Sequence, residues 1–474
     1  MKVLKNYLYS ASYQVFLLMV PLITIPYISR VLGPQGVGIN TLTNSTIQYF
    51  VLLANLGLST YGQREIAYKK SDHGQLNNIF WEIEIISVLA TLLSFLSFLF
   101  FLSFNSKYYS YYWAQSFLII ASALDVSWFF MGLENFKITV IRNFIFKIVT
   151  IILVFTFVRK SSDTFIYILI ISVLTIISNL SMWPYLKRYV HKVSIKDLHV
   201  IRHIKPTVQL FIPQIAISVY GVLNKVMLGH ISSVESSGYY DNSDKIIRIC
   251  LALLVAFSTV MMPHVAEAFV NGEKEKIEIF VKRGIAIAIS FSLPLMAGII
   301  AIAPDFIPWF FGARFRPVIS VISIEAVAIL PISCATIVGA QYLVPLNRNN
   351  QYTISIICGA LINVIINVPL IRYLSADGAA IATVIAETVV ALVQIKYVTK
   401  SINLHKTFMG SYKPLVSSGI LFIIVYTMTR VFPAKFIFIL MEIVLGFSSY
   451  IVTMYVMKAD LILDIKDLIR HKKI

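Results

Sequence analysis

Runs of about 20 apolar residues recur from one end of this 474-residue chain to the other. A helix of that length crosses the hydrocarbon core of a bilayer, which is about 30 Å thick. Hydrophobic residues make up 58% of the chain and charged residues 13%, and no polar stretch is long enough for a soluble domain. The sequence therefore predicts an all-α, multi-pass membrane protein with about 14 transmembrane helices.

The formal net charge of +17 points to topology rather than to nucleic acid. When about 14 spans are assigned with both chain ends on the same side, most of the 40 Lys and Arg residues fall in the loops of that side. An excess of basic residues marks cytoplasmic loops, so both termini are expected in the cytoplasm of a cell with the protein in its plasma membrane. The basic loops would contact anionic lipid, and no nucleic-acid partner is expected.

Two distant stretches share one order of features. In each, a basic residue and then Leu-Gly close an apolar run, and Asn-Ser follows inside the next run. The first copy is Ser29-Arg-Val-Leu-Gly33 with Asn44-Ser45, and the second is Lys225-Val-Met-Leu-Gly229 with Asn242-Ser243. Hydrophobic bias alone does not produce this order, so the chain is interpreted as duplicated.

Other joints repeat as well. The inner turn Gly132-Leu-Glu-Asn-Phe-Lys137 matches Pro345-Leu-Asn-Arg-Asn-Asn350, and Arg64-Glu65 with Gly74 matches 264–267 with Gly272. Two pseudo-symmetric six-helix lobes around a central cavity are expected, related by an axis along the membrane normal because six is even. The expected parts are an N-terminal lobe (1–190), a cytoplasmic linker (191–206), a C-terminal lobe (207–405), and two accessory helices with a cytoplasmic tail (406–474).

Three motifs carry a family resemblance. Ser29-Arg-Val-Leu-Gly33, Gly62-Gln-Arg-Glu-Ile-Ala67 and Gly378-Ala-Ala-Ile-Ala-Thr-Val-Ile-Ala-Glu387 resemble those of Wzx-type polysaccharide repeat-unit flippases. Their superfamily also includes MATE drug exporters and lipid II flippases. The resemblance implies a MATE-like fold and movement of an undecaprenyl-pyrophosphate-linked oligosaccharide from the inner to the outer leaflet by alternating access. Such flippases serve capsule, exopolysaccharide or O-antigen biosynthesis in bacteria, and other polysaccharide-assembly membrane proteins are conceivable partners.

Four ionisable residues share one face of the eighth predicted span: Asp241, Asp244, Lys245 and Arg248. Ionisable groups inside spans are costly and face a cavity or a partner. Two interpretations stay open. Asp241–Lys245 and Asp244–Arg248 are ion pairs at i, i+4 spacing, or the stripe lines the cavity and Arg248 meets a phosphate.

Further charges lie in or at the ends of other spans. Lys147 in the fifth span and Asp125 in the fourth are predicted to form an ion pair, a ligand site, or both. Arg30 and Lys225 end corresponding spans, where they either reach the outer headgroups or bind an anionic headgroup between the lobes. Glu387, mid-span and without an evident partner in the sequence, could couple transport to a H⁺ or Na⁺ gradient.

No Gly is followed by Lys, so the chain has no P-loop, and no bound cofactor, metal site or enzymatic activity is expected. An ion-coupled multidrug exporter on the same fold is the nearest alternative, although it would favour an acidic cavity. A membrane polysaccharide polymerase or ligase is an alternative of another class. Such an enzyme would need a large outer loop, and every predicted outer loop is short.

Overall fold

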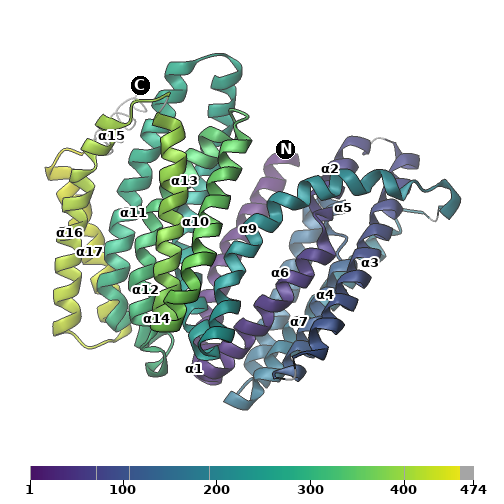
Figure 1. Cartoon of the computed structure of the whole chain (residues 1–474), viewed down its shortest axis with the longest axis horizontal. Helices are drawn as coiled ribbons and strands as arrows, with labels where there is room; N and C mark the ends of the chain where they lie inside the picture. The colour runs from purple at the N-terminus through teal and green to yellow at the C-terminus, as the bar shows by residue number, and fades with distance from the viewer. Residues whose placement is uncertain (1, 71, 106, 192, 400, 460–474) are drawn as a thin grey trace. The chain divides into compact units, whose positions relative to one another are not determined.

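The structure of this chain is a computed structural model that describes residues 2–70, 72–105, 107–191, 193–399 and 401–459 (Figure 1). These residues form helices joined by turns and contain no β-strand. A helix satisfies its own backbone hydrogen bonds, which is what a span surrounded by lipid requires. The all-α class predicted from the sequence is confirmed.

Within the described residues, nine helices or helical runs are long and apolar enough to cross a membrane. One of them, α14 (Asn349–Thr399), is broken at Ser375 and therefore supplies two segments. Helix α1 (Lys2–Asn55) is broken at Gly33 and also supplies two, and α9 (Ile204–Ile231) and α10 (Val234–Val270) add one each. The described chain thus carries the fourteen helical segments that the hydrophobic runs predict.

By their packing, the residues divide into two compact units, Met1–Gly229 and His230–Ile474. The first unit contains α1 and most of α9, and between them lie α2 (Leu58–Lys69), α3 (His73–Ser103), α4 (Tyr109–Ala123), α5 (Ser127–Gly132), α6 (Phe136–Phe157), α7 (Thr164–Leu180) and α8 (Trp183–Leu186). This division groups α9 with the first unit, whereas the sequence assigns it to the second lobe. The lobe boundaries stay a prediction.

The break in α1 falls in a cluster of Gly and Pro, Gly33-Pro-Gln-Gly36. Gly33 has φ 68° and ψ −179°, a conformation that a side chain disfavours, and Pro34 then starts the next helical segment. Gly36 is needed for another reason, because a β-carbon there would lie 2.5 Å from the Thr164 hydroxyl oxygen. The chain thus passes from one helical segment to the next through a one-residue break, and Gly36 allows a close approach between α1 and the start of α7.

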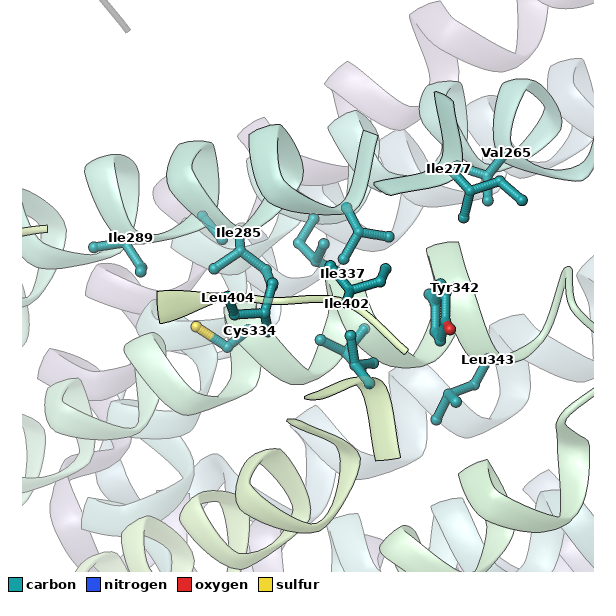
Figure 2. Close-up of a cluster of buried hydrophobic side chains, with 14 of the residues drawn as sticks. Val265, Ile277, Ile285, Ile289, Cys334, Ile337, Tyr342, Leu343, Ile402 and Leu404 are labelled. Carbon is teal, nitrogen blue, oxygen red and sulfur yellow. The ribbon is translucent and has the colours of Figure 1, made fainter. Parts of the chain in front are cut away.

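The second unit contains α10, α11 (Lys274–Phe310), α12 (Val318–Glu325), α13 (Ile329–Thr336), the π-helix η6 (Ile337–Leu343), α14, α15 (His405–Gly410), α16 (Tyr412–Val431) and α17 (Phe436–Val456). Figure 2 shows its main apolar cluster, in which Ile285 of α11, Ile337 of η6 and Leu404 lie among buried neighbours. The accessory helices α16 and α17 pack on α11, where the Tyr450 hydroxyl donates to the Ser290 carbonyl at 2.6 Å.

One predicted repeat is reproduced in backbone detail. Glu134 and Asn347 occupy matching places in the two inner turns, and both have φ 57°. In each turn the N–H of that residue donates to the carbonyl three residues back, and the next N–H donates to the carbonyl five residues back. Gly74 and Gly272 do not match in this way. Gly74 lies in the first turn of α3, whereas Gly272 has φ 72° between α10 and α11.

Candidate functional site

The first unit contains a pocket of about 290 Å³ between α1, α6 and α7. Its polar lining includes Arg142, Asn143 and Lys147 of α6 with Tyr167, Ser178 and Asn179 of α7. Val20, Thr24 and Ile28 of α1 close another side at successive four-residue spacing, so they lie on one helix face. The predicted cavity residue Lys147 thus does line a pocket.

Aromatic contacts hold the two helices that frame this pocket. Phe16 of α1 packs on Phe144 of α6 with ring centroids 4.2 Å apart, and Tyr27 stacks on Phe155 at 4.1 Å. Both pairs have the same sequence offset, so α1 and α6 run parallel. The Tyr27 hydroxyl also donates to the Val158 carbonyl at 2.7 Å. The two contacts are eleven residues apart along each helix, which corresponds to about 16 Å. Lys147, near the middle of α6, lies between them.

Arg142 is the second cation of the pocket, and we did not single it out from the sequence. Its guanidinium donates to Oδ1 of Asn179 at 3.0 Å and to Oδ1 of Asn143 at 2.9 Å. Arg142 lies near the start of the fifth predicted span, where the sequence alone does not distinguish it from a cation of the inner loop. The sequence did contain a signal for this site, because Arg142, Asn143 and Lys147 fall within six residues that have apolar residues on both sides.

The electrostatics of this pocket favour an anion. Among the side chains that the structure describes, two cationic ones line it and no Asp or Glu does. A cation within a span is costly unless a counter-charge or a polar group compensates it. A guanidinium and an ammonium at one site can bind phosphate oxygens through charge-assisted hydrogen bonds.

Asp125 lies in an adjoining pocket of about 230 Å³. Its Oδ1 accepts the backbone N–H of Ser127 at 2.9 Å, which fixes the carboxylate at the start of α5. Thr175 and Asn179 line both pockets, whereas Lys147 lines only the first and Asp125 only the second. No ion pair joins Asp125 to Lys147 in the described structure. Of the two predicted roles, the ion pair is therefore absent from these residues, and the ligand site stays a prediction.

In the second unit, the stripe on α10 forms the two ion pairs expected from i, i+4 spacing. Lys245 Nζ lies 2.5 Å from Asp241, and Arg248 Nε lies 2.7 Å from Asp244. Both carboxylates are buried, whereas the Arg248 side chain is 63% exposed. The ion-pair interpretation is therefore confirmed, and the exposed guanidinium edge can still meet a ligand.

The same helix makes polar contacts to its neighbours. The Ser243 hydroxyl donates to the buried carboxylate of Glu325 on α12 at 2.5 Å. In the first unit, Gln115 of α4 bonds to Asn40 and Asn44 of α1 at 3.2 and 3.3 Å. The second and fourth predicted spans of each half are thus joined by side-chain hydrogen bonds, which agrees with the duplication.

The remaining predicted residues are placed as follows. Arg30 is exposed on α1, three residues before the break, and Lys225 is half-buried on α9. Glu387 is half-buried on α14, and each of the three side chains has an interaction partner. The expectation that Glu387 has no partner is therefore wrong. The sequence of one helix does not indicate which groups other parts of the fold bring beside it. Neither Arg30 nor Lys225 lines the Lys147 pocket.

Comparisons with known proteins agree with this architecture. The "Putative O-antigen transporter" of Escherichia coli (strain K12) is 23% identical over 405 residues, which is 83% of this chain and 96% of that protein. The "Putative O-antigen transporter" of Shigella dysenteriae is 24% identical over 80% of this chain and 95% of its own length.

Solved structures share the fold. Lipid II flippase MurJ in an inward closed conformation superposes with a TM-score of 0.74 at 16% identity and covers 96% of this chain and 100% of its own. An inward-facing MATE multidrug transporter has a TM-score of 0.66 at 15% identity and covers 80% of this chain and 94% of its own. The MATE-like fold is therefore confirmed.

The family comparison is direct. Residues 3–269, more than half of the chain, match the family described as "Polysaccharide biosynthesis protein". The match includes α1, α6 and α7, which form the Lys147 pocket, and α10 with its charged stripe. This chain is a multi-pass membrane protein that belongs to the polysaccharide biosynthesis protein family.

Proposed function

We propose that this protein is a flippase that moves undecaprenyl-pyrophosphate-linked oligosaccharide repeat units from the inner to the outer leaflet of the bacterial cytoplasmic membrane. The observation that carries the proposal is the pocket of α1, α6 and α7, whose described wall contains Arg142 and Lys147 and no acidic residue. The family match and the O-antigen transporter relatives support the same substrate class.

The pocket suits a headgroup rather than a whole repeat unit. Its volume of about 290 Å³ is at the lower end of ligand pockets, which run from about 300 to 1,000 Å³. A pyrophosphate carrying about two negative charges needs compensation in a low-dielectric site, because an unpaired buried charge costs several kcal/mol or more. Arg142 and Lys147 would supply that compensation, while the sugars would remain outside this pocket.

The proposed protein makes and breaks no covalent bond, so it is a secondary-type transporter and not an enzyme. The protein would bind the anionic headgroup and hold it while it changes from the inward-open to the outward-open state. In this topology both termini and the segment between α8 and α9 face the cytoplasm. That orientation rests on the distribution of Lys and Arg.

A complementation experiment tests the function. The chain is expressed in a bacterial strain that lacks its own repeat-unit flippase, and surface polysaccharide is measured together with the amount of protein in the membrane. The unaltered chain should restore polysaccharide. Arg142→Glu and Lys147→Glu should each abolish restoration, because they place a negative charge where the headgroup must bind.

Lys137→Glu is the matched control, since Lys137 lies on the same helix, is exposed and does not line the pocket. It should restore polysaccharide like the unaltered chain. Normal polysaccharide with both Arg142→Glu and Lys147→Glu would refute the cationic headgroup site. Drug resistance conferred by the unaltered chain without restored polysaccharide would favour the exporter alternative.

A further inference from the structure

We propose that the pocket containing Asp125, about 230 Å³ in volume and here called the Asp125 pocket, binds the first sugar of the oligosaccharide, the one joined to the pyrophosphate. The inference rests on the proposed function, because it requires a pyrophosphate in the neighbouring Lys147 pocket. It adds a second subsite to that function and names the ligand of this subsite as an uncharged pyranose ring. Discrimination between repeat units would then begin at this sugar.

The two pockets adjoin along α7. Thr175 and Asn179, which are four residues apart and share one face of that helix, line both pockets. The Asn179 side chain bonds on both sides, because its Oδ1 accepts from Arg142 at 3.0 Å and its Nδ2 donates to the carbonyl of Ala121 at 2.7 Å. Ala121 is part of the wall of the Asp125 pocket. The first sugar is bonded directly to the pyrophosphate, so phosphates beside Arg142 require a sugar site that adjoins theirs.

The lining of the Asp125 pocket suits an uncharged group with many hydroxyls. Among the residues that the structure describes, no Lys, Arg or His lines this pocket, and its polar groups are amides, hydroxyls and the single carboxylate of Asp125. Carboxylate and amide oxygens accept hydrogen bonds, amide nitrogens donate them, and hydroxyls do both. Sugar hydroxyls also donate and accept, so they match this mixture. A phosphate in the same place would meet Asp125 with no cation in the described wall to compensate it.

Several of these polar groups have hydrogen-bonding capacity left for a ligand. Gln48 of α1 and Ser87 of α3 line the pocket, and neither side chain makes a hydrogen bond to another residue that the structure describes. Asn55 accepts at its Oδ1 from the Ser59 backbone N–H and hydroxyl, at 3.3 and 3.2 Å, which leaves its amide hydrogens for another acceptor. Polar groups shielded from water are stabilised when they are paired, and the hydroxyls of a sugar would pair these.

The opposite wall of the Asp125 pocket is held in place by its own contacts. The Asp125 Oδ1 accepts the backbone N–H of Ser127 at 2.9 Å, which fixes the carboxylate. The Trp128 ring stacks on Phe80 with centroids 5.6 Å apart, and Gly62 packs so closely that a β-carbon there would lie 2.5 Å from that ring. A wall that is already fixed loses little conformational freedom when a ligand binds, which favours affinity.

The volume restricts the ligand to a small group. Ligand pockets run from about 300 to 1,000 Å³, and this one is smaller, so it suits one sugar rather than an oligosaccharide. The Lys147 pocket offers an apolar face of α1, with Val20 and Ile28, and two cations. Together the two pockets therefore present an apolar wall, a cationic wall and a neutral polar wall. These are the chemistries that a prenyl chain, a pyrophosphate and a sugar require.

A binding experiment on the full-length protein in lipid nanodiscs tests the sugar subsite. The probes are farnesyl pyrophosphate and four derivatives in which its terminal phosphate carries glucose, galactose, N-acetylglucosamine or N-acetylgalactosamine. Calorimetry should show that at least one sugar-bearing probe binds about tenfold more tightly than farnesyl pyrophosphate, because several new hydrogen bonds form. Gln48→Leu and Ser87→Ala should each reduce this preference by about 2- to 10-fold, the usual worth of one hydrogen bond, without weakening farnesyl pyrophosphate.

Two controls and a further variant accompany these measurements. Ser97→Ala is matched to Ser87→Ala, because Ser97 lies on the same helix, is exposed and lines neither pocket. Glu275→Gln changes an exposed residue of α11. Both should leave every affinity unchanged. Asp125→Asn keeps the oxygen that accepts from Ser127, so it tests the pocket if Gln48→Leu or Ser87→Ala does not fold, and it should also lower the preference for the sugar.

The outcomes separate this inference from the proposed function. Farnesyl pyrophosphate binding without a preference for any sugar would overturn the subsite and leave the headgroup site intact. A preference that is the same in Gln48→Leu, Ser87→Ala and Asp125→Asn would place the sugar elsewhere and overturn it equally. Loss of the preference when sodium chloride replaces choline chloride would assign the pocket to a cation and contradict the proposal. Absence of farnesyl pyrophosphate binding to the unaltered protein would instead refute the headgroup site on which the inference rests.

Discussion

The guanidinium of Arg142 donates to the side-chain oxygen of Asn179 at 3.0 Å, and this contact joins two pockets of opposite charge. Both residues lie inside helices that the family match covers. The Asn179 side chain is a neutral amide, so this contact adds no negative charge beside Arg142. An acidic residue at position 179 would change that.

Asn179→Asp should reduce polysaccharide restoration at least about tenfold, equivalent to about 1.4 kcal/mol. The new carboxylate would bind Arg142 in the geometry of the present amide and neutralise half of the cationic pocket. Polysaccharide in the flippase-null strain is the measurement, with membrane protein level as the reference. Asn271→Asp, in the exposed turn after α10, is the control and should be silent. Full restoration by Asn179→Asp would show that Arg142 need not be available.

The segment before α9 is bound to the first unit through a buried carboxylate. Glu82 accepts from Arg202 and from the backbone N–H of His199, and His203 lies between it and the Tyr61 hydroxyl, 2.5 Å from each. Glu82→Ala should therefore release this segment. A lost hydrogen bond to a charged group costs about 1.5–3 kcal/mol, and most of the loss should come from buried His203 because water screens half-exposed Arg202.

Trypsin cleavage after Lys196 or Arg202 measures this release in detergent. It should accelerate several-fold in Glu82→Ala, whereas Glu275→Gln should behave like the unaltered protein. Cleavage at the original rate would mean that other contacts hold the segment, such as the hydrogen bond from the Trp81 ring to the His191 carbonyl.

Gly62 should tolerate no side chain. A β-carbon there would lie 2.5 Å from the Trp128 ring, in the contact between α2 and α5. Gly62→Ala should destabilise the protein by about 1–3 kcal/mol, the usual cost of overpacking. Gly419→Ala is the matched control, because a β-carbon there meets nothing within 4 Å and removing a helical glycine is worth up to about 1 kcal/mol. Thermal unfolding in detergent should lower the midpoint for the first variant and leave or raise it for the second.

The Asp244–Arg248 pair can be examined by a double-mutant cycle. Arg248→Gln takes the guanidinium away from a buried carboxylate and should destabilise the protein more than Asp244→Asn combined with Arg248→Gln. The coupling energy should fall within about 0.5–3 kcal/mol, towards the lower end because the Arg248 side chain is 63% exposed. Thermal unfolding of the three variants gives the value. Strict additivity would show that the pair is not energetically coupled.

The proposed orientation predicts which sites react from outside the cell. A cysteine introduced at Asn105, between α3 and α4, should react with a membrane-impermeant thiol reagent in intact cells, and one at Lys196 should not. Labelling after cell disruption confirms that Lys196 is accessible. The reverse pattern would invert the topology and with it the assumed direction of transport.

The sequence by itself determined the fold class and its repeats. Apolar runs long enough to span a bilayer predict helices, because a helix forms all of its backbone hydrogen bonds within one segment. Local spacing also determined the pairs on α10, since residues four apart on a helix are neighbours whatever surrounds them. The matching φ of Glu134 and Asn347 followed from the repeated inner turn for the same local reason.

Tertiary structure decided everything that depends on contacts between distant segments. It placed Asp125 and Lys147 in separate pockets, gave Glu387 a partner, and brought Arg142 to Asn179 across 37 residues of sequence. It also buried Glu84 without a donor, which no pattern along α3 indicates. Periodicity specifies which face of a helix a residue occupies, but the neighbour on that face depends on how the helices pack.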